Sequence, residues 1–155
     1  MTYRITGLDP SPYRALFGLS EAELAARGAI RMTVTDHPGF PCRISLTDGA
    51  IGETILLVNH VSHDVANPYR ASHAIFVTEG AERAGEYIDE PAPVFATRVL
   101  SLRGFNGDGM MAEAILAQPG EVDAGIRKLF ANAAVEAIHA HNATRGCFSA
   151  RIERT

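Results

Sequence analysis

Short segments of β-type sequence recur along this chain, bounded by turn residues and without the regular alternation with helices that a parallel sheet requires. The clearest, residues 54–61, carries the unbroken apolar run Ile-Leu-Leu-Val at its centre, which is typical of a strand covered on both faces. Residues 43–47 alternate apolar and polar side chains, and Asp48 and Gly49 mark a turn. The two segments are therefore predicted to form a hairpin, and we expect an α+β fold with a mainly antiparallel sheet.

Further strands are predicted from alternating or apolar segments elsewhere, at residues 3–6, 30–35, 74–78, 94–103 and 110–116. Asn106 and Gly107 are a strong turn signal between the last two of these segments. Residues 62–72 and 79–93 are polar or rich in Gly and Pro, so they are expected to be loops. With the helices and the C-terminal segment described next, the pattern predicts about seven or eight strands and two or three helices.

Two helices are indicated by their ends and by their periodicity. Ser20 and Glu23 stand at the two positions of a capping box, and Gly28 marks the end of that helix. Residues 121–132 are amphipathic, with four apolar side chains on one face: Val122, Ile126, Leu129 and Phe130.

The C-terminal segment, residues 133–152, admits two interpretations. Helical propensity would extend the preceding helix, but alternate positions up to His141 fit a period of two, and so do the residues after Gly146. We prefer a hairpin whose turn lies at residues 142–146.

The composition bounds the class of protein. A chain of 155 residues with 46% hydrophobic and 21% charged residues is typical of one globular domain, here residues 1–155. A net charge of −4 gives no overall attraction to nucleic acid. The chain has no apolar signal core at its start and no apolar run near the roughly 18 residues of a membrane helix. We therefore expect a cytoplasmic protein with neither nucleic acid nor membrane as a partner.

Neither a cofactor nor a metal is predicted. The motifs Gly-x-Gly-x-x-Gly, Gly-Lys-Ser/Thr and Gly-x-Ser-x-Gly, which bind nucleotides or carry a nucleophilic serine, do not occur. His60, His63 and His73 are of a type that ligates metals, but their spacing matches no diagnostic zinc motif. The two cysteines form no Cys-x-x-Cys pair, which argues against a disulfide scaffold or a cysteine-rich zinc site.

Residues 36–79 contain four of the six histidines and the tripeptides Pro-Cys-Arg and Pro-Tyr-Arg. Arg43 lies on the polar face of its predicted strand, while Tyr69 and Arg70 precede the next strand. Two guanidinium groups and a phenol near one end of a sheet can hold a carboxylate or phosphate through bidentate hydrogen bonds. The alternative is structural, with each arginine paired to a nearby Asp or Glu.

The predicted terminal hairpin suggests a second constellation. With its turn at residues 142–146, His141 faces Cys147 and His139 faces Ser149, at the short Cβ separations of cross-strand neighbours. A thiolate beside a histidine is a usable nucleophile, but a free cysteine is more often a small buried hydrophobe. Cys42 has the same two possibilities: exposure beside a cation, or packing in the core.

Four blocks of the sequence carry a resemblance to a known family: GFPCRISLTDGAIGETILL, NPYRASHAIFV, LSLRGFNGDGMM and HAHNATRGCFSARIER. They resemble the bacterial family catalogued as domain of unknown function 1203, from about residue 36 to the C-terminus. The resemblance implies no reaction, substrate or cofactor. It supports the terminal hairpin, because the last block has the form of two strands and a turn.

Three functions follow from these observations as hypotheses. The first is a domain that binds a small anionic molecule through Arg43, Tyr69 and Arg70. The second is a small enzyme that uses Cys147 with His141, and the third is a non-catalytic protein that forms a homodimer. The residues predicted to line a ligand site are Cys42, Arg43, Tyr69, Arg70, His73, His141, Asn142 and Cys147.

Overall fold

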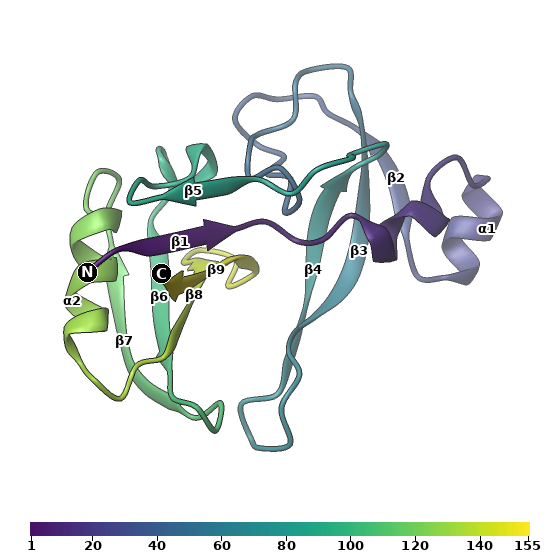
Figure 1. The fold of residues 1–155 in the computed structure, drawn as a ribbon. Coiled ribbons are helices and arrows are strands. Elements are labelled where there is room, and N and C mark those ends of the chain that lie inside the picture. The colour runs from purple at the N-terminus through teal and green to yellow at the C-terminus, as the bar shows by residue number, and fades with distance from the viewer.

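The computed structural model describes residues 1–155 and contains two antiparallel sheets with helices around them (Figure 1). The larger sheet has six strands in the order β5-β1-β9-β8-β6-β7. Their bounds are β1 Tyr3–Thr6, β5 Glu86–Ile88, β6 Leu100–Phe105, β7 Met111–Ala117, β8 Ala137–Asn142 and β9 Phe148–Arg154. The smaller sheet has the order β2-β3-β4, with bounds β2 Ile30–Thr33, β3 Thr54–His63 and β4 Ala71–Thr78. The predicted α+β class is confirmed, with a strand count slightly above the predicted one.

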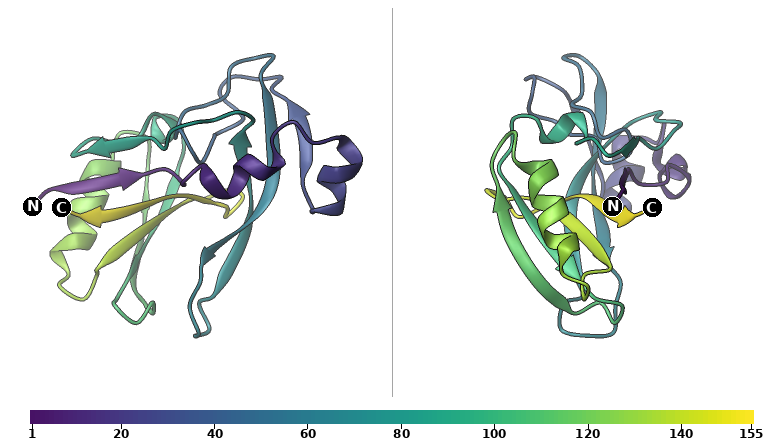
Figure 2. Two further views of the ribbon diagram at one scale, coloured as in Figure 1. Left: turned by 45° about the vertical axis from the view of Figure 1, so that its right-hand side comes forward. Right: turned by 60° about the vertical axis from the view of Figure 1, so that its left-hand side comes forward.

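The helices lie at opposite ends of the molecule. In Figure 2, α2 (Val122–Ala131) covers one face of the six-stranded sheet, and its predicted apolar face is buried against that sheet. The short helix α1 (Glu21–Ala26) lies beside β2, and its predicted capping box between Ser20 and Glu23 is present. Two 3₁₀ segments, Ser11–Leu16 and Pro93–Phe95, complete the helical structure. Neither α-helix has the length and apolar character needed to cross a membrane.

Each sheet has its own hydrophobic core. The larger core lies between the six-stranded sheet and α2 and includes Leu102, Ile126 and Ile138. The smaller core joins the three-stranded sheet to the N-terminal segment and includes Leu24 and Leu56.

The predicted hairpin between residues 43–47 and 54–61 is wrong. Residues 41–48 form a turn instead, with isolated bridges from Pro41 to Asp48 and from Cys42 to Phe76. The strand β3 pairs with β2 and β4. The alternating pattern of residues 43–47 predicted an extended strand. Leu46 instead adopts a positive φ of 59°, which an extended strand does not contain.

Close backbone contacts hold this turn in place. The Gly85 N–H donates to the Ile44 carbonyl oxygen at 2.7 Å, and Gly7 also packs closely against this carbonyl. A Cβ atom on Gly7 would lie 1.9 Å from that oxygen, and one on Gly85 would lie 2.2 Å from the Ser45 oxygen. Only glycine permits both approaches.

Other boundaries also differ from the prediction. The β3–β4 hairpin is longer than expected, so its loop is confined to residues 64–70. The short strand β5 lies within the predicted loop 79–93, and β6 begins later than the predicted residue 94. Pairing with β1 makes residues 86–88 a strand, although their own sequence signal is weak.

The terminal hairpin is confirmed, but its predicted register is wrong. His141 faces Phe148 rather than Cys147, and His139 faces Arg151. The register is already shifted by one residue at the turn, and a bulge between Ala140 and His141 adds a second residue to the shift at His139. The alternating pattern of the hairpin's sequence does not mark this bulge. Cys147 consequently lies in the turn, immediately before β9.

Candidate functional site

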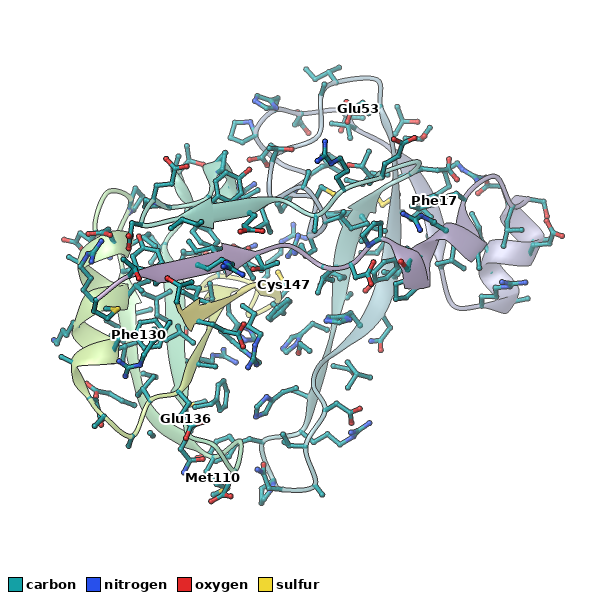
Figure 3. All side chains as sticks on the ribbon, viewed as in Figure 1. Phe17, Glu53, Met110, Phe130, Glu136 and Cys147 are labelled. Atoms are coloured by element: carbon teal, nitrogen blue, oxygen red, sulfur yellow. The ribbon has the colours of Figure 1, made fainter.

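Five of the six histidines gather where the β3–β4 hairpin meets the six-stranded sheet. His60 and His73 are cross-strand partners in β3 and β4, and His139 and His141 project from β8. The ring centroids of His73 and His141 are 4.9 Å apart, and those of His63 and His139 are 5.1 Å apart. Side chains from the two sheets point toward one another in this region, and Cys147 lies at its edge (Figure 3). We call His60, His63, His73, His139 and His141 the histidine cluster.

Local hydrogen bonds orient the rings at the centre of the cluster. The Nδ1 atom of His141 lies 2.9 Å from the Gly146 carbonyl oxygen. A carbonyl oxygen only accepts, so His141 donates from Nδ1 and its Nε2 is an acceptor in the neutral ring. The Nδ1 atom of His73 lies 2.7 Å from the Ser62 hydroxyl, which leaves its Nε2 without a protein partner.

Burial favours the neutral form of three rings in the cluster, His73, His139 and His141. Burial, with the positive charge of Arg151 next in importance, lowers the pKa of His139 to about 3. Burial is also the main reason that the pKa of His141 falls to about 4, although its hydrogen bond to Gly146 opposes the shift. The pKa of His73 is lowered first by burial and then by Arg103 and Arg43.

Arg43 and Arg103 beside the cluster have no carboxylate partner. Each of the protein's other arginines either forms an ion pair with Asp or Glu or is exposed to solvent. Arg43 is only 2% exposed, and Arg103 is half-buried with a single hydrogen bond, from Nε to the Ser101 hydroxyl. Burial lowers the pKa of both guanidinium groups. The junction between the sheets therefore holds two positive charges that no acidic side chain neutralises.

Arg43 also reaches the thiol of Cys147. Its Nε donates to the Phe148 carbonyl oxygen, its Nη1 donates to the Pro41 carbonyl oxygen, and its Nη2 lies 3.1 Å from Cys147 Sγ. Asn142 Nδ2 lies 3.5 Å from the same sulfur. The Oδ1 atom of Asn142 is buried and has no hydrogen-bond partner, so this amide has unused acceptor capacity at the site.

Five of the eight residues predicted to bind a ligand are brought together here: Arg43, His73, His141, Asn142 and Cys147. Cys42 adjoins them in sequence, but it is 1% exposed and packs in the smaller core, where its sulfur accepts the Thr78 N–H.

Tyr69 and Arg70 lie elsewhere, at the tip of the β3–β4 hairpin. Arg70 is exposed and paired with Asp64, while the Tyr69 ring contacts Phe105. The Arg43 N–H donates to the Phe76 carbonyl oxygen, and Phe76 lies six positions after Arg70, which corresponds to roughly 20 Å of extended chain. The structure therefore separates Arg70 from Arg43.

Sequence reasoning missed Arg103 and His139 as members of this site. Arg103 is opposite His139, and Ser101 is opposite His141, on the adjacent strands β6 and β8. A signal was available, because Ser101 and Arg103 alternate with the buried Leu100 and Leu102. That alternation shows which face they share, but not which histidines they meet.

A separate pocket of about 400 Å³ opens at the far end of the cluster, beside His63. Its charged lining residues are Asp64, Asp108, Glu136 and Arg151. Three carboxylates against one guanidinium make this pocket unfavourable for an anion. Across the whole chain, no three His, Cys, Asp or Glu side chains converge so as to hold a metal ion.

The fold and the site define an α+β protein whose junction between two sheets is rich in histidine and holds two arginines, Arg43 and Arg103, without a carboxylate partner. The family model described as "Protein of unknown function (DUF1203)" matches residues 39–154. The chain therefore belongs to that family, as the resemblance in its sequence predicts. Neither a curated protein nor a solved structure matches this chain.

Proposed function

We propose that this protein binds a small anionic molecule, a carboxylate or a phosphate, at the junction between its two sheets. The observation that carries the proposal is the pair Arg43 and Arg103, which are not exposed and have no carboxylate partner. Buried or half-buried charges in proteins are normally paired. An anionic ligand supplies the missing negative charge.

The residues around the junction would contribute to anion binding in different ways. Arg103 is half-buried and uses only one donor within the protein, so its remaining N–H groups are available for a bidentate contact. The Nε2 atoms of His73 and His141 become donors when the rings take up protons. Arg43 is fully buried, so it contributes its charge rather than a direct contact.

This arrangement predicts that binding is coupled to proton uptake. The pKa values of His73 and His141 are lowered by burial and by the neighbouring arginines. A bound anion opposes the effect of those arginines and raises both pKa values. The affinity for the anion is therefore expected to increase as the pH falls from 7 toward 6.

The test is a thermal-shift and calorimetric screen of inorganic phosphate, sulfate and small mono- and dicarboxylates. A ligand at 100 times its Kd stabilises the folded state by about 2.7 kcal/mol. Arg103→Met is expected to abolish the shift, whereas the matched control Arg70→Met, at the exposed hairpin tip, is expected to retain it. If no anion raises the Tm, or if Arg103→Met binds as the wild type does, the proposal fails.

A further inference from the structure

The strand β7 forms one edge of the six-stranded sheet, and no other strand pairs with its outer side (Figure 2). It runs for seven residues and packs mainly against β6 and α2. Leu116 is 66% exposed, and Ala114 is also exposed. The one charged residue of the strand is Glu113, whose carboxylate accepts a hydrogen bond from Asn132. A long edge with so little charge is open to pairing with another strand.

The other three sheet edges are short or blocked. The strand β5 has three residues and carries the ion pair between Arg4 and Glu86. The strand β2 has four residues and lies beside α1. The turn at residues 41–48 blocks the free side of β4, where the Arg43 N–H donates to the Phe76 carbonyl oxygen. The edge at β7 is therefore the one that is both long and open.

The hydrogen bonds of β6 show in which direction its backbone groups point. The Phe105 carbonyl oxygen accepts the Glu136 N–H, so the backbone groups of Phe105 point toward β8. These directions alternate from one residue to the next in an antiparallel strand. The backbone groups of Gly104 and Leu102 therefore point toward β7.

The backbone directions in β7 follow from this pairing. The β7 partners of those two residues are Glu113 and Ile115, and the bulge in the pair lies before Glu113. The N–H and C=O groups of Glu113 and Ile115 point back to β6. Those of Ala114 and Leu116 consequently point outward, where this chain offers them no partner.

We propose that β7 pairs with the β7 strand of a second copy of this chain, across a twofold axis at Ile115. The strands are antiparallel, and Ala114 faces Leu116 of the second copy. These two residues exchange both N–H···O bonds, and the axis repeats the pair on its other side. The two six-stranded sheets become one continuous sheet.

The side chains of β7 fit themselves in this register. Ile115 and Ala117 lie on the face covered by α2, so Ala114 and Leu116 lie on the opposite, exposed face. The small Ala114 meets the large Leu116 of the second copy, and the two Ile115 side chains meet at the axis. Glu113 faces the uncharged Ala117 of the second copy. Each position therefore has an apolar or neutral neighbour.

Neighbouring registers fit less well. An axis at Ala114 makes the two Glu113 side chains diagonal neighbours, which brings like charges together. An axis at Leu116 pairs Ala114 with Gln118, whose N–H already donates to the Glu121 carboxylate. The strand's own sequence thus favours the axis at Ile115.

The helix α2 leaves room for the second copy. Gly125 faces Leu102 of β6 as well as Ile115 and Ala117 of β7, so the helix lies over the β6–β7 pair. Strands in a sheet lie about 4.8 Å apart, so an axis beside β7 places the two α2 helices roughly 10 Å apart. Helices pack at that distance, and the helix pair adds to the area that the strands bury.

The first test is sedimentation equilibrium of the whole protein from about 1 μM to about 1 mM, because small interfaces are weak. We expect the mean mass to rise from the 16.6 kDa of one chain toward twice that value. Ala114→Pro removes an outward N–H, which an edge strand tolerates, and is expected to raise the dimer Kd at least about tenfold. Ile88→Lys, 53% exposed at the opposite edge, is the matched control and is expected to dimerise.

The second test needs no mutation and follows amide hydrogen exchange by NMR. The N–H groups of Glu113 and Ile115 bond to β6 and are expected to exchange slowly at every concentration. Those of Ala114 and Leu116 are expected to exchange rapidly in dilute protein and at least about tenfold more slowly in concentrated protein.

A mass of one chain at every concentration overturns the proposal. A dimer in which the Ala114 and Leu116 amides still exchange rapidly also overturns it, because the interface then lies elsewhere. The same holds if folded Ala114→Pro associates as the wild type does. If Ala114→Pro does not fold, hydrogen exchange in the wild type decides. Arg103→Met is expected to dimerise normally although it no longer binds an anion, so the two proposals fail or succeed separately.

Discussion

Acid is expected to destabilise this protein between pH 7 and pH 5, in a range where most carboxylates are still ionised. The groups responsible are His139 and His141, each 2% exposed, with pKa values lowered mainly by burial to about 3 and about 4. In the unfolded chain the pKa of each ring returns to the ordinary histidine value of about 6.5. The unfolded state therefore binds more protons in this range, and the free energy of unfolding falls as the pH falls.

The magnitude follows from the proton linkage. At pH 5 the folded protein keeps both rings neutral, whereas in the unfolded chain each ring is almost fully protonated. Each histidine then lowers the free energy of unfolding by about 2 kcal/mol between pH 7 and pH 5, or about 4 kcal/mol for the pair. This is a large share of the roughly 5–15 kcal/mol by which a domain is stable. Because the pKa values of both rings in the folded protein lie below 5, the expected loss of free energy depends little on their exact positions.

Urea unfolding at pH 7 and at pH 5, followed by circular dichroism, measures this quantity. His141→Gln keeps a polar side chain without a titrating ring and is expected to remove about half of the loss. His37→Gln is the matched control, because His37 is exposed on the loop at residues 36–40. A wild-type free energy of unfolding that is unchanged between the two pH values refutes the reasoning. An equal loss in His141→Gln refutes the assignment to that residue.

Three further predictions concern stability. Arg98→Ala leaves the half-buried carboxylate of Asp48 without its bidentate partner, so we expect a loss of about 3 kcal/mol in urea unfolding. Gly7→Ala places a Cβ 1.9 Å from the Ile44 oxygen; we expect little folded protein, which the near-ultraviolet circular dichroism spectrum checks. Ser20→Ala removes the capping hydrogen bond of α1 and is expected to cost about 1 kcal/mol, seen as a lower urea midpoint.

The elements that could be predicted are those whose signal lies within one segment. The capping box of α1, the apolar face of α2 and the two hairpins β6–β7 and β8–β9 each depend on neighbouring residues. Local propensity, periodicity and turn chemistry are enough for such elements.

The predictions that were wrong concern segments whose conformation depends on distant residues. Residues 43–47 alternate as a strand does, but they form a turn. Gly7 and Gly85, which are far away in sequence, pack closely against this turn. The register of β8 against β9 depends on a bulge. A bulge adds one residue to one strand of a pair, and the alternating pattern of the hairpin does not mark where that residue falls.

The difference between local signals and contacts between distant segments also applies to the candidate site. The sequence by itself determined that the chain is an α+β protein of its family and that Arg43, His73, His141, Asn142 and Cys147 are residues of interest. Only the tertiary structure decided that these five meet, that Arg103 joins them and that Arg70 does not. The reason is physical: the site forms where two sheets with separate cores approach each other. Which side chains face one another across that junction is set by packing between elements, which no pattern within a single segment records.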